Sequence, residues 1–381
     1  MKVLFSGGGS GGHISPALAM ADIIKMNIPD AEIAFVGTPK GIENSLIPQA
    51  GYKLYQIEIE GIRRAITLEN ARAIYLVLKS QMKAKKIIKE FEPDIVIGTG
   101  GYACWPALNA AAEMGIPTIV HESNAIPGMA VRKLQNKVDI VLTNFESTAA
   151  KLSSSANVVN VGNPLRAACS TITKAEARAK LGIDDKVRLV TLSFGGSLGA
   201  PAINRAACEM MSHFSKNKCE VRCFHVGGKR YYENASNFFA AYDLERDNRF
   251  SLMEYTSDLP LYMAAADVVI CRAGAMTLTE IARMGKAAII IPSPHVADNH
   301  QYKNAKALAD ANAAIVISED ELNSEGKCRV CDWVDKLYAD EEFRNTLSDN
   351  VKSFAKDDVE KRIFESIEEL IQRKNKSILS K

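Results

Sequence analysis

The chain has 381 residues, 47% of them hydrophobic and 24% charged, which is typical of a globular protein of about two or three domains and excludes a disordered or fibrous chain. Its 47 lysines and arginines nearly balance 45 aspartates and glutamates, and a formal charge of +2 argues against a nucleic-acid-binding protein. No apolar run reaches about 18 residues, and the first residues, MKVLF, do not resemble a signal peptide, so we expect a protein of the cytoplasm without a spanning helix.

Short runs rich in β-branched residues alternate with helical patterns along most of the chain. This alternation predicts parallel sheets covered by helices. In the first half we expect strands at about 2–5, 32–36, 53–57, 94–97, 117–121, 139–142 and 157–161. In the second half we expect them at about 188–193, 221–226, 249–253, 268–271, 288–291 and 314–317.

The pattern breaks near the middle, where Gly162, Asn163 and Pro164 separate two strand-rich halves. We therefore predict an α/β fold with two doubly wound, Rossmann-like parallel-sheet domains, residues 1–163 and 164–348, facing a cleft. From about residue 349 on, apolar residues recur at helical spacing, namely Val351, Phe354, Val359, Ile363, Ile367 and Leu370. Residues 349–381 should form an amphipathic helix that packs back on the N-terminal domain.

A glycine-rich loop, SGGGSGGH at residues 6–13, follows the first predicted strand. It runs into Ser15-Pro16, a helix-capping residue and a first-turn proline, so helix N–H groups face the loop. Its glycines also fit the GxGxxG pattern of dinucleotide sites, but the second strand runs into Gly37-Thr38 instead of the acidic residue that holds a ribose. We favour a loop for another phosphate, with dinucleotide binding and a merely tight turn as alternatives.

Two further glycine loops follow strands, GTGGY at residues 98–102 and GGSLGA at residues 195–200. Parallel sheets bind ligands beyond the carboxyl ends of their strands. Three such loops, two in one domain and one in the other, indicate two phosphorylated ligands that meet across a cleft. A P-loop is excluded, because Gly-Lys-Ser/Thr follows none of them.

Beyond the predicted strand at 268–271, a turn with Gly274 opens a helix that carries Glu280. A carboxylate can accept two hydrogen bonds from a cis-diol such as that of ribose, which makes Glu280 a candidate for binding a ribose. The alternative is that Glu280 is a solvated surface residue. A polar cluster at residues 298–304 begins another helix and is weak evidence by itself.

The eight cysteines are spread over the chain, at positions 104, 169, 208, 219, 223, 271, 328 and 331. In a long chain of intracellular type, thiols usually stay reduced and buried. Cys328 and Cys331 have CxxC spacing, but neither a second pair nor a histidine lies near them. We therefore expect a structural or incidental pair rather than a metal or redox site.

Together, the motifs resemble those of the MurG-type undecaprenyl-diphospho-muramoylpentapeptide β-N-acetylglucosaminyltransferases of peptidoglycan synthesis. The resemblance is carried, in order, by GGGSGGHISPALA, GTGGYACWPAL, HESNAIPG at 121–128, GNPLR at 162–166, GGSLGA, RAGAMTLTE at 272–280 and PSPHVADNHQYKNA. These motifs extend from residue 5 to 305. The chain departs from the family pattern at Ile14-Ser15, Cys104-Trp105 and Leu198.

The resemblance implies a GT-B fold, with an N-terminal domain for a lipid acceptor and the membrane and a C-terminal domain for UDP-GlcNAc. It implies an inverting transfer of GlcNAc to the C4 hydroxyl of undecaprenyl-diphospho-MurNAc-pentapeptide, which gives a β(1→4) bond. Such an enzyme would work as a peripheral protein on the cytoplasmic face of the plasma (inner) membrane, with other cell-wall synthesis proteins as possible partners. No D-x-D triplet occurs, so we expect neither a metal nor another cofactor.

The resemblance also assigns roles to individual residues. The residues expected to bind the donor are Ser10, Gly11, Gly12, Asn124, Arg166, Gly196, Ser197, Tyr255, Thr256, Ala275, Glu280 and Gln301. Of these, Ser197 would hold the diphosphate with Arg166 nearby, and Glu280 would hold the ribose. Gln301 would touch the sugar hydroxyls, and backbone groups near Tyr255 would read the uracil. The residues expected at the acceptor diphosphate and lipid are Gly9, Gly100, Gly101 and Tyr102.

An inverting transfer needs a base for the attacking hydroxyl, with a pKa within reach of neutrality. His13 is our candidate, because it ends the first glycine loop and because a helix N-terminus disfavours the charged imidazolium. The alternatives for His13 are a binding role without proton transfer and a structural role. Glu122 is its nearest competitor as the base, whereas the amide of Asn124 cannot act as one.

Residues 61–90 contain eight lysines and arginines against two glutamates, with an apolar run at 74–78 between them. A basic amphipathic helix of this kind suits an anionic membrane surface, and a solvated helix whose apolar side faces the core is the alternative. Two other functions remain open on the residues alone. One is a UDP-sugar epimerase, and the other is a module that binds a nucleotide sugar or a lipid diphosphate without catalysis.

Overall fold

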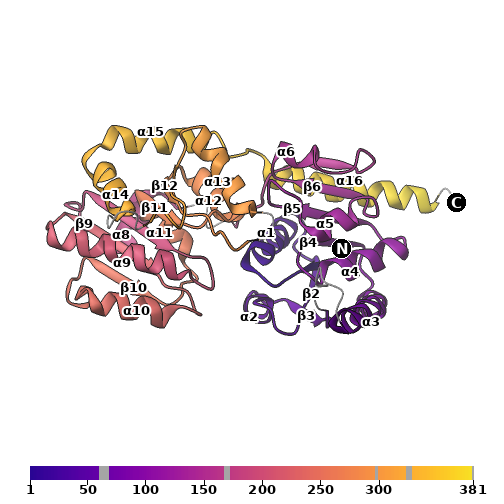
Figure 1. The fold of residues 1–381 in the computed structure, drawn as a ribbon. Helices are drawn as coiled ribbons and strands as arrows, with labels where there is room; N and C mark the ends of the chain where they lie inside the picture. The colour runs from indigo at the N-terminus through magenta and orange to yellow at the C-terminus, as the bar shows by residue number, and fades with distance from the viewer. Residues whose placement is uncertain (60–67, 167–171, 297–298, 323–327, 380–381) are drawn as a thin grey trace. The chain divides into compact units, whose positions relative to one another are not determined.

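The structure, a computed structural model, describes residues 1–59, 68–166, 172–296, 299–322 and 328–379. It divides into two compact units, of which the first contains Met1–Arg166 and Asp357–Lys381 and the second contains Ala167–Lys356. Each unit is built on one parallel sheet (Figure 1). The α/β architecture predicted from the alternation of strands and helices is confirmed.

The sheet of the first unit has the order β3-β2-β1-β4-β5-β6-β7. Its strands are β1 (Lys2–Gly7), β2 (Glu32–Gly37), β3 (Lys53–Gln56), β4 (Ile95–Gly100), β5 (Thr118–Glu122), β6 (Ile140–Thr143) and β7 (Val158–Asn160). Its helices are α1 (Gly11–Asn27), α2 (Glu43–Gln49), α3 (Leu68–Phe91), α4 (Cys104–Glu113), α5 (Met129–Leu134), α6 (Glu146–Ala149) and α16 (Val359–Leu379). The strand order reverses between β1 and β4, the topological switch point at which doubly wound folds bind ligands.

The sheet of the second unit has the order β10-β9-β8-β11-β12-β13. Its strands are β8 (Leu189–Phe194), β9 (Val221–Val226), β10 (Phe250–Met253), β11 (Val268–Cys271), β12 (Ala287–Ile290) and β13 (Ile315–Val316). Its helices are α8 (Lys174–Lys180), α9 (Pro201–Lys216), α10 (Tyr232–Ala241), the 3-10 helix η1 (Leu244–Arg246), α11 (Leu259–Ala265), α12 (Ala275–Met284), α13 (His300–Asp310), α14 (Arg329–Ala339) and α15 (Glu341–Lys352). Within the described part of the chain, no helix is long and apolar enough to cross a membrane.

The central strands are buried on both faces, which explains their continuous apolar sequences. All six residues of β4 and of β8 are buried. In β1, Phe5 joins the core beneath α1 and α16, whereas its neighbour Leu4 joins the core beneath α3 and α4 on the opposite face. Every strand predicted from the sequence is present, with ends shifted by about three residues at most.

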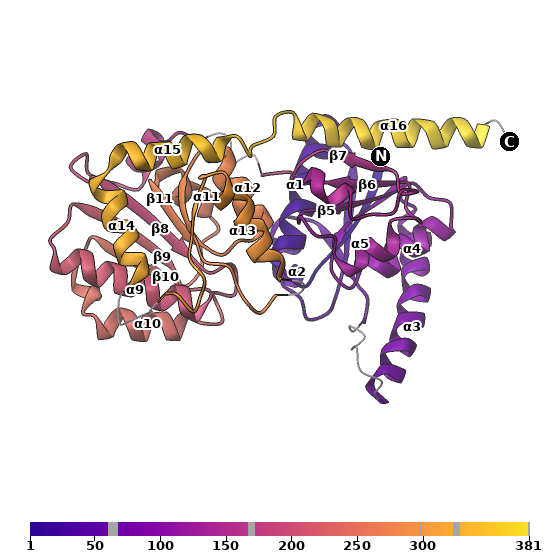
Figure 2. The same ribbon diagram turned by 45° about the horizontal axis from the view of Figure 1, so that its top comes forward.

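The C-terminal region corrects one prediction, because residues 349–381 do not form a single helix. Val351 completes α15 and is buried in the core of the second unit, and Phe354 packs there as well. The chain then turns at Asp358, whose φ is +57°, and α16 begins at Val359. Helix α16 packs against α1 in the first unit (Figure 2). The chain therefore returns to the first unit only for its last helix.

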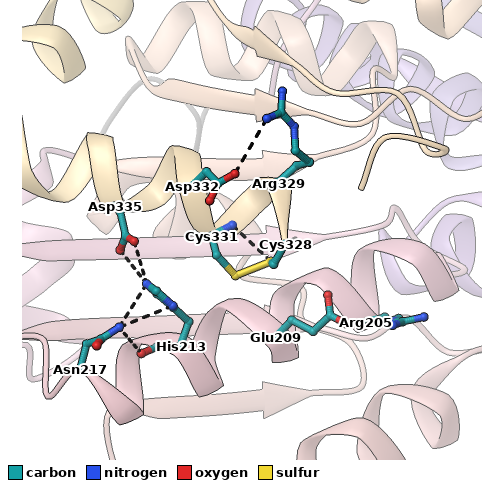
Figure 3. Close-up of a disulfide and its surroundings, with 9 residues drawn as sticks. All are labelled: Arg205, Glu209, His213, Asn217, Cys328, Arg329, Cys331, Asp332 and Asp335. Carbon is teal, nitrogen blue, oxygen red and sulfur yellow. Dashed lines mark hydrogen bonds and ion pairs between the residues drawn. A yellow bond between two sulfur atoms is a disulfide. The ribbon is translucent and has the colours of Figure 1, made fainter. Parts of the chain in front are cut away.

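The cysteine pair at the start of α14 is oxidised, although thiols in a chain of this type usually stay reduced. Cys328 and Cys331 form a disulfide, with their Cα atoms 5.2 Å apart in the first turn of the helix (Figure 3). The i, i+3 spacing on one helical turn brings the two side chains together. Five other cysteines are free, and Cys104, Cys208, Cys223 and Cys271 among them are buried. Cys169 lies outside the described residues.

We predict that Ile367→Ala destabilises the first unit. Ile367 of α16 is 1% exposed in the core of that unit, and removal of a buried isoleucine side chain costs about 2 to 5 kcal/mol. Urea unfolding followed by circular dichroism measures the loss. Glu368→Ala, one residue further along on the exposed side of α16, is the control and should change stability little. Equal stability of the two variants would contradict the docking of α16.

Candidate active site

The loops after β1 and β4 lie against each other at the carboxyl edge of the first sheet. A Cβ atom on Gly101 would collide with the backbone of Gly8, and the φ of Gly101 is +84°, so glycine is needed there. The hydroxyl of Thr99 donates a hydrogen bond to the carbonyl oxygen of His13 over 2.7 Å. Two of the three predicted glycine loops, those after β1 and β4, are thus packed together at the switch point.

His13, the third residue of α1, is held by one of its ring nitrogens. Its Nδ1 lies 2.9 Å from the carbonyl oxygen of Gly8 and 3.2 Å from the hydroxyl of Ser10. A carbonyl oxygen can only accept, so Nδ1 carries the hydrogen and Nε2 of the neutral ring holds a lone pair. A Cβ atom on Gly100 would lie only 2.8 Å from Nε2, so this nitrogen faces the β4–α4 loop.

The N-terminus of α1 is open to a ligand. The N-cap residue Ser10 has an extended backbone, and its side chain accepts no hydrogen bond from the first turn of α1. Gly9 faces open space, and the side chain of Tyr102 is 61% exposed. N–H groups in the first turn of a helix attract anions. The predicted residues that the two loops bring together here are Gly9, Ser10, Gly11, Gly12, Gly100, Gly101 and Tyr102.

Glu122, the competing candidate for the base, uses both carboxylate oxygens in hydrogen bonds to the loop that follows it. Its side chain is buried, and one carboxylate oxygen accepts hydrogen bonds from the backbone N–H and the side-chain amide of Asn124, at 2.9 and 3.1 Å. The other oxygen accepts from the backbone N–H of Gly128 at 2.7 Å. A buried carboxylate with both oxygens engaged is poorly suited to take a proton from a substrate. The geometry favours His13 over Glu122.

The side chain of Arg166 forms an ion pair with Asp22 in the first unit. Arg166 is the last residue of the first segment of the first unit, and its Nε lies 3.3 Å from Oδ2 of Asp22 on α1. The pair is partly exposed and contributes little to stability. The predicted role of Arg166 beside the donor diphosphate remains a prediction.

The glycine loop of the second unit follows β8 and precedes α9. Gly196 has a φ of +89° and faces open space, and Ser197 is partly exposed. Gly199 and Gly228 meet backbone to backbone, with φ of +86° and +83°, and a Cβ on either would collide with the other segment. The N-cap residue of α9 is Ala200, whose side chain cannot accept a hydrogen bond from the first turn. The loop is therefore rigidly packed on one side and open to an anion at Gly196 and Ser197.

A buried polar network that sequence reasoning missed supports this loop. The side-chain amide of Asn204 on α9 donates to the carbonyl oxygens of Gly227 and Tyr231, at 3.2 and 3.0 Å. Its oxygen lies 3.1 Å from Nε2 of His225, and burial lowers the pKa of this histidine to about 4. His225 is thus neutral and donates to Asn204. Only the contact between β9 and α9 reveals the network, since neither residue stands in a recognisable motif.

Glu280 lies on α12, as predicted. Its side chain is half-buried, and burial raises its pKa from 4.5 to about 7. Neither a hydrogen bond nor an ion pair joins it to another residue in the described part of the chain. A carboxylate in this position is available to accept hydrogen bonds from a ligand.

The remaining predicted donor residues also lie on the second unit. Oε1 of Gln301 accepts a hydrogen bond from the backbone N–H of Ser293 at 2.9 Å, which leaves its NH2 group as a donor toward a ligand. Tyr255 is 39% exposed, and Nζ of Lys229 lies 4.6 Å from its ring centroid. Thr256 accepts from the N–H of Asp258, and Ala275 is the first residue of the uncapped α12. Among the described residues, no group of three or more His, Cys, Asp and Glu side chains could hold a metal ion.

Two family models match the chain. The glycosyltransferase family 28 N-terminal domain matches residues 3–143, and the glycosyltransferase family 28 C-terminal domain matches residues 190–363. Each match falls in one half of the sequence, in agreement with the two sheets. The two-sheet architecture is the GT-B fold.

The chain is also similar to individual proteins. It is 41% identical, over 85% of its length and 87% of the relative's, to the UDP-N-acetylglucosamine--N-acetylmuramyl-(pentapeptide) pyrophosphoryl-undecaprenol N-acetylglucosamine transferase of Alkaliphilus oremlandii. It superimposes on the crystal structure of Acinetobacter baumannii MurG with a TM-score of 0.72 and 27% identity, over 97% of this chain and 99% of the other.

A putative UDP-N-acetylglucosamine 2-epimerase from Listeria monocytogenes has a TM-score of 0.67 over 98% of this chain and 97% of its own. Its identity is only 14%, so this likeness shows the shared fold alone. The sequence identity and the matching domains point to the transferases instead. By its two glycosyltransferase family 28 domains and its likeness to these relatives over most of its length, the chain belongs to the MurG family of N-acetylglucosaminyltransferases.

Proposed function

We propose that this chain transfers GlcNAc from UDP-GlcNAc to the C4 hydroxyl of undecaprenyl-diphospho-MurNAc-pentapeptide, with inversion, forming a β(1→4) bond. The names of the relatives support a transferase with these two substrates. The observation that carries the chemistry is His13, whose Nε2 holds a lone pair beside two glycine loops that are open to a ligand.

In the proposed step, Nε2 of His13 takes the proton of the C4 hydroxyl as the hydroxyl oxygen attacks C1 of GlcNAc. The bond between C1 and the phosphate oxygen breaks, and its electron pair leaves with UDP. The proton remains on His13 as imidazolium until solvent removes it. The hydrogen bond from Nδ1 to Gly8 is kept throughout, so the ring does not need to turn.

The leaving diphosphate gains negative charge during this step. We place it at Gly196 and Ser197, where open backbone N–H groups and the N-terminus of α9 favour an anion. Glu280 would accept hydrogen bonds from the ribose hydroxyls, and the NH2 group of Gln301 would donate to the sugar. Backbone groups at Tyr255 and Thr256 would contact the uracil. The other proposed donor contacts are Ser10, Gly11, Gly12, Asn124, Arg166 and Ala275.

The acceptor diphosphate is assigned to the first unit. Gly9, Gly100 and Gly101 offer backbone without side chains, and the exposed ring of Tyr102 stands beside them. The open start of α1 attracts a phosphate there as it does in other doubly wound folds. This placement would bring the sugar of the acceptor next to His13.

One assay separates this proposal from its two rivals. The protein is incubated with radiolabelled UDP-GlcNAc and a short-chain lipid acceptor. A transferase yields labelled lipid and free UDP in equal amounts, an epimerase yields an isomeric UDP-sugar without the acceptor, and a binding module yields no product.

We also propose that α3 rests on the anionic cytoplasmic face of the membrane. Leu78 and Met82, one turn apart, are 63% and 67% exposed, and Lys83, Lys86 and Lys89 are exposed on the same helix. Exposed apolar side chains among lysines are typical of helices that lie on anionic membranes. Leu76 is buried, so only part of the apolar run is available, and Arg63 and Arg64 lie outside the described residues.

We predict that His13→Ala lowers kcat by about two to four orders of magnitude, the usual contribution of general base catalysis. The KM for UDP-GlcNAc should stay near its original value, because the proposed donor contacts lie mainly on the second unit. Steady-state kinetics measure both parameters. His213→Ala, which removes a histidine paired with Asp335 in the second unit, is the control. A kcat within tenfold of the original would exclude His13 as the base.

We predict that UDP-GlcNAc binds about tenfold more weakly at pH 6 than at pH 8, because only the ionised form of Glu280 accepts two hydrogen bonds from ribose. A pKa of about 7 in the free protein means that Glu280 is mostly protonated at pH 6 and mostly ionised at pH 8. Calorimetry measures the affinity and the protons released on binding. Glu280→Gln should bind weakly at both pH values and release no proton through this residue; unchanged affinity in this variant would refute the ribose assignment.

We predict that Lys83, Lys86 and Lys89, replaced together by glutamate, release the protein from vesicles rich in anionic lipid, since each lysine near the surface contributes about 1 kcal/mol. Lys85 is left in place because it pairs with Glu113 at 2.7 Å. Cosedimentation measures binding, and UDP-GlcNAc affinity should not change. The matched control replaces the exposed Lys180, Lys186 and Lys216 of the second unit by glutamate. Equal release by both triple variants would argue against α3 as the contact.

A further inference from the structure

The carboxylate of Glu43 lies at the centre of the first glycine loop. Glu43 is the first residue of α2, yet its side chain is 0% exposed. One of its oxygens accepts hydrogen bonds from the backbone N–H and the hydroxyl of Thr38, at 2.8 and 2.7 Å. The other oxygen accepts from the backbone N–H of Gly9 at 2.9 Å. A single side chain thus connects the loop after β2 to the loop after β1.

Three glycines make room for this carboxylate. A Cβ atom on Gly37 would lie 2.6 Å from Cγ of Glu43, and a Cβ on Gly8 or Gly41 would collide with the carboxylate oxygens. Burial alone would raise the pKa of Glu43, but hydrogen bonds from Gly9 and Thr38 outweigh burial and lower it. The side chain is therefore ionised at neutral pH, and its hydrogen bonds are charge-assisted and strong.

The loop segment that Glu43 holds is the one that holds His13. The carbonyl of Gly8 belongs to the peptide unit whose N–H is that of Gly9. Because this peptide is planar, a hydrogen bond from the Gly9 N–H to Glu43 fixes the direction of the Gly8 carbonyl. That carbonyl accepts from Nδ1 of His13 at 2.9 Å. Rotation of the peptide would remove the carbonyl and leave Nδ1 beside the hydroxyl of Ser10, which can donate to a bare Nδ1 as well as accept from Nδ1–H.

We propose that Glu43 is a positioning residue for the catalytic base: through the Gly8–Gly9 peptide it fixes the His13 tautomer that leaves Nε2 free to take a proton. The expected effect of Glu43 on the rate of transfer rests on the proposed function, in which His13 is the base. Its expected effect on the tautomer of His13 does not depend on that function.

Glu43→Gln tests the proposal with little change in size. The side-chain amide of glutamine has one acceptor oxygen. Both hydrogen bonds from Thr38 go to the same carboxylate oxygen, Oε1, so we expect the glutamine oxygen to take the place of Oε1. The NH2 group then takes the place of Oε2 and faces the N–H of Gly9, so the hydrogen bond from Gly9 is lost. Thr38→Val is the matched control, because it removes one hydrogen bond to the same carboxylate and keeps the one from Gly9.

Nitrogen-15 NMR of the protein with labelled histidine reports the tautomer directly. We expect the hydrogen of His13 on Nδ1 in the unchanged protein and in Thr38→Val, and a mixture with the Nε2–H form in Glu43→Gln. We expect kcat to fall by about tenfold to a hundredfold in Glu43→Gln, with the KM for UDP-GlcNAc unchanged. A purely structural role would lower stability in both variants and leave the tautomer in place.

The outcomes separate this proposal from the function on which it rests. An Nε2–H form in the unchanged protein would overturn it, even if Glu43→Gln failed to fold. So would a Glu43→Gln protein that keeps the Nδ1–H form and its kcat, or an equal tautomer shift in Thr38→Val. If Glu43→Gln shifts the tautomer while His13→Ala retains kcat, the positioning by Glu43 stands and the assignment of His13 as the base fails.

Discussion

The close approach of backbone segments at the carboxyl edge of the first sheet is the constraint on which the candidate site depends. The loops after β1, β2 and β4 meet only because glycine stands where a side chain would fill occupied space, at Gly8, Gly37, Gly41 and Gly101. These glycines therefore serve packing, and a substitution at any of them would push the loops apart. Of the four, only Gly101 also belongs to the proposed acceptor site.

Both units support a glycine loop with a buried polar side chain, but the charges differ. In the first unit the support is the ionised carboxylate of Glu43. In the second unit it is the neutral pair of Asn204 and His225. The two loops are therefore held by hydrogen bonds of different character, to an ionised carboxylate in the first unit and between neutral side chains in the second.

The strands and the glycine loops could be predicted from the sequence because their signals are local. Apolar β-branched runs and loops such as GGSLGA depend on neighbours along the chain. The roles of Glu43 and Asn204 depend on contacts with residues more than twenty positions away, and neither belongs to a recognisable motif.

The break between α15 and α16 could not be predicted from the sequence for a related reason. Apolar spacing continues through it, although Val351 packs in one unit and Ile363 in the other. Likewise, CxxC spacing does not reveal whether Cys328 and Cys331 are joined.

The return of the chain to the first unit at α16 has a consequence for synthesis on the ribosome. Domains generally fold as they emerge, beginning from the N-terminus. Here the core beneath α1 includes Ile363, Ile367 and Leu370, which are made after the whole second unit. The second unit therefore has its complete sequence before the first one does, and the core beneath α1 lacks its α16 side chains until residues 359–379 have been made. A nascent chain stalled before residue 359 would hold a complete second unit and an unfinished first unit.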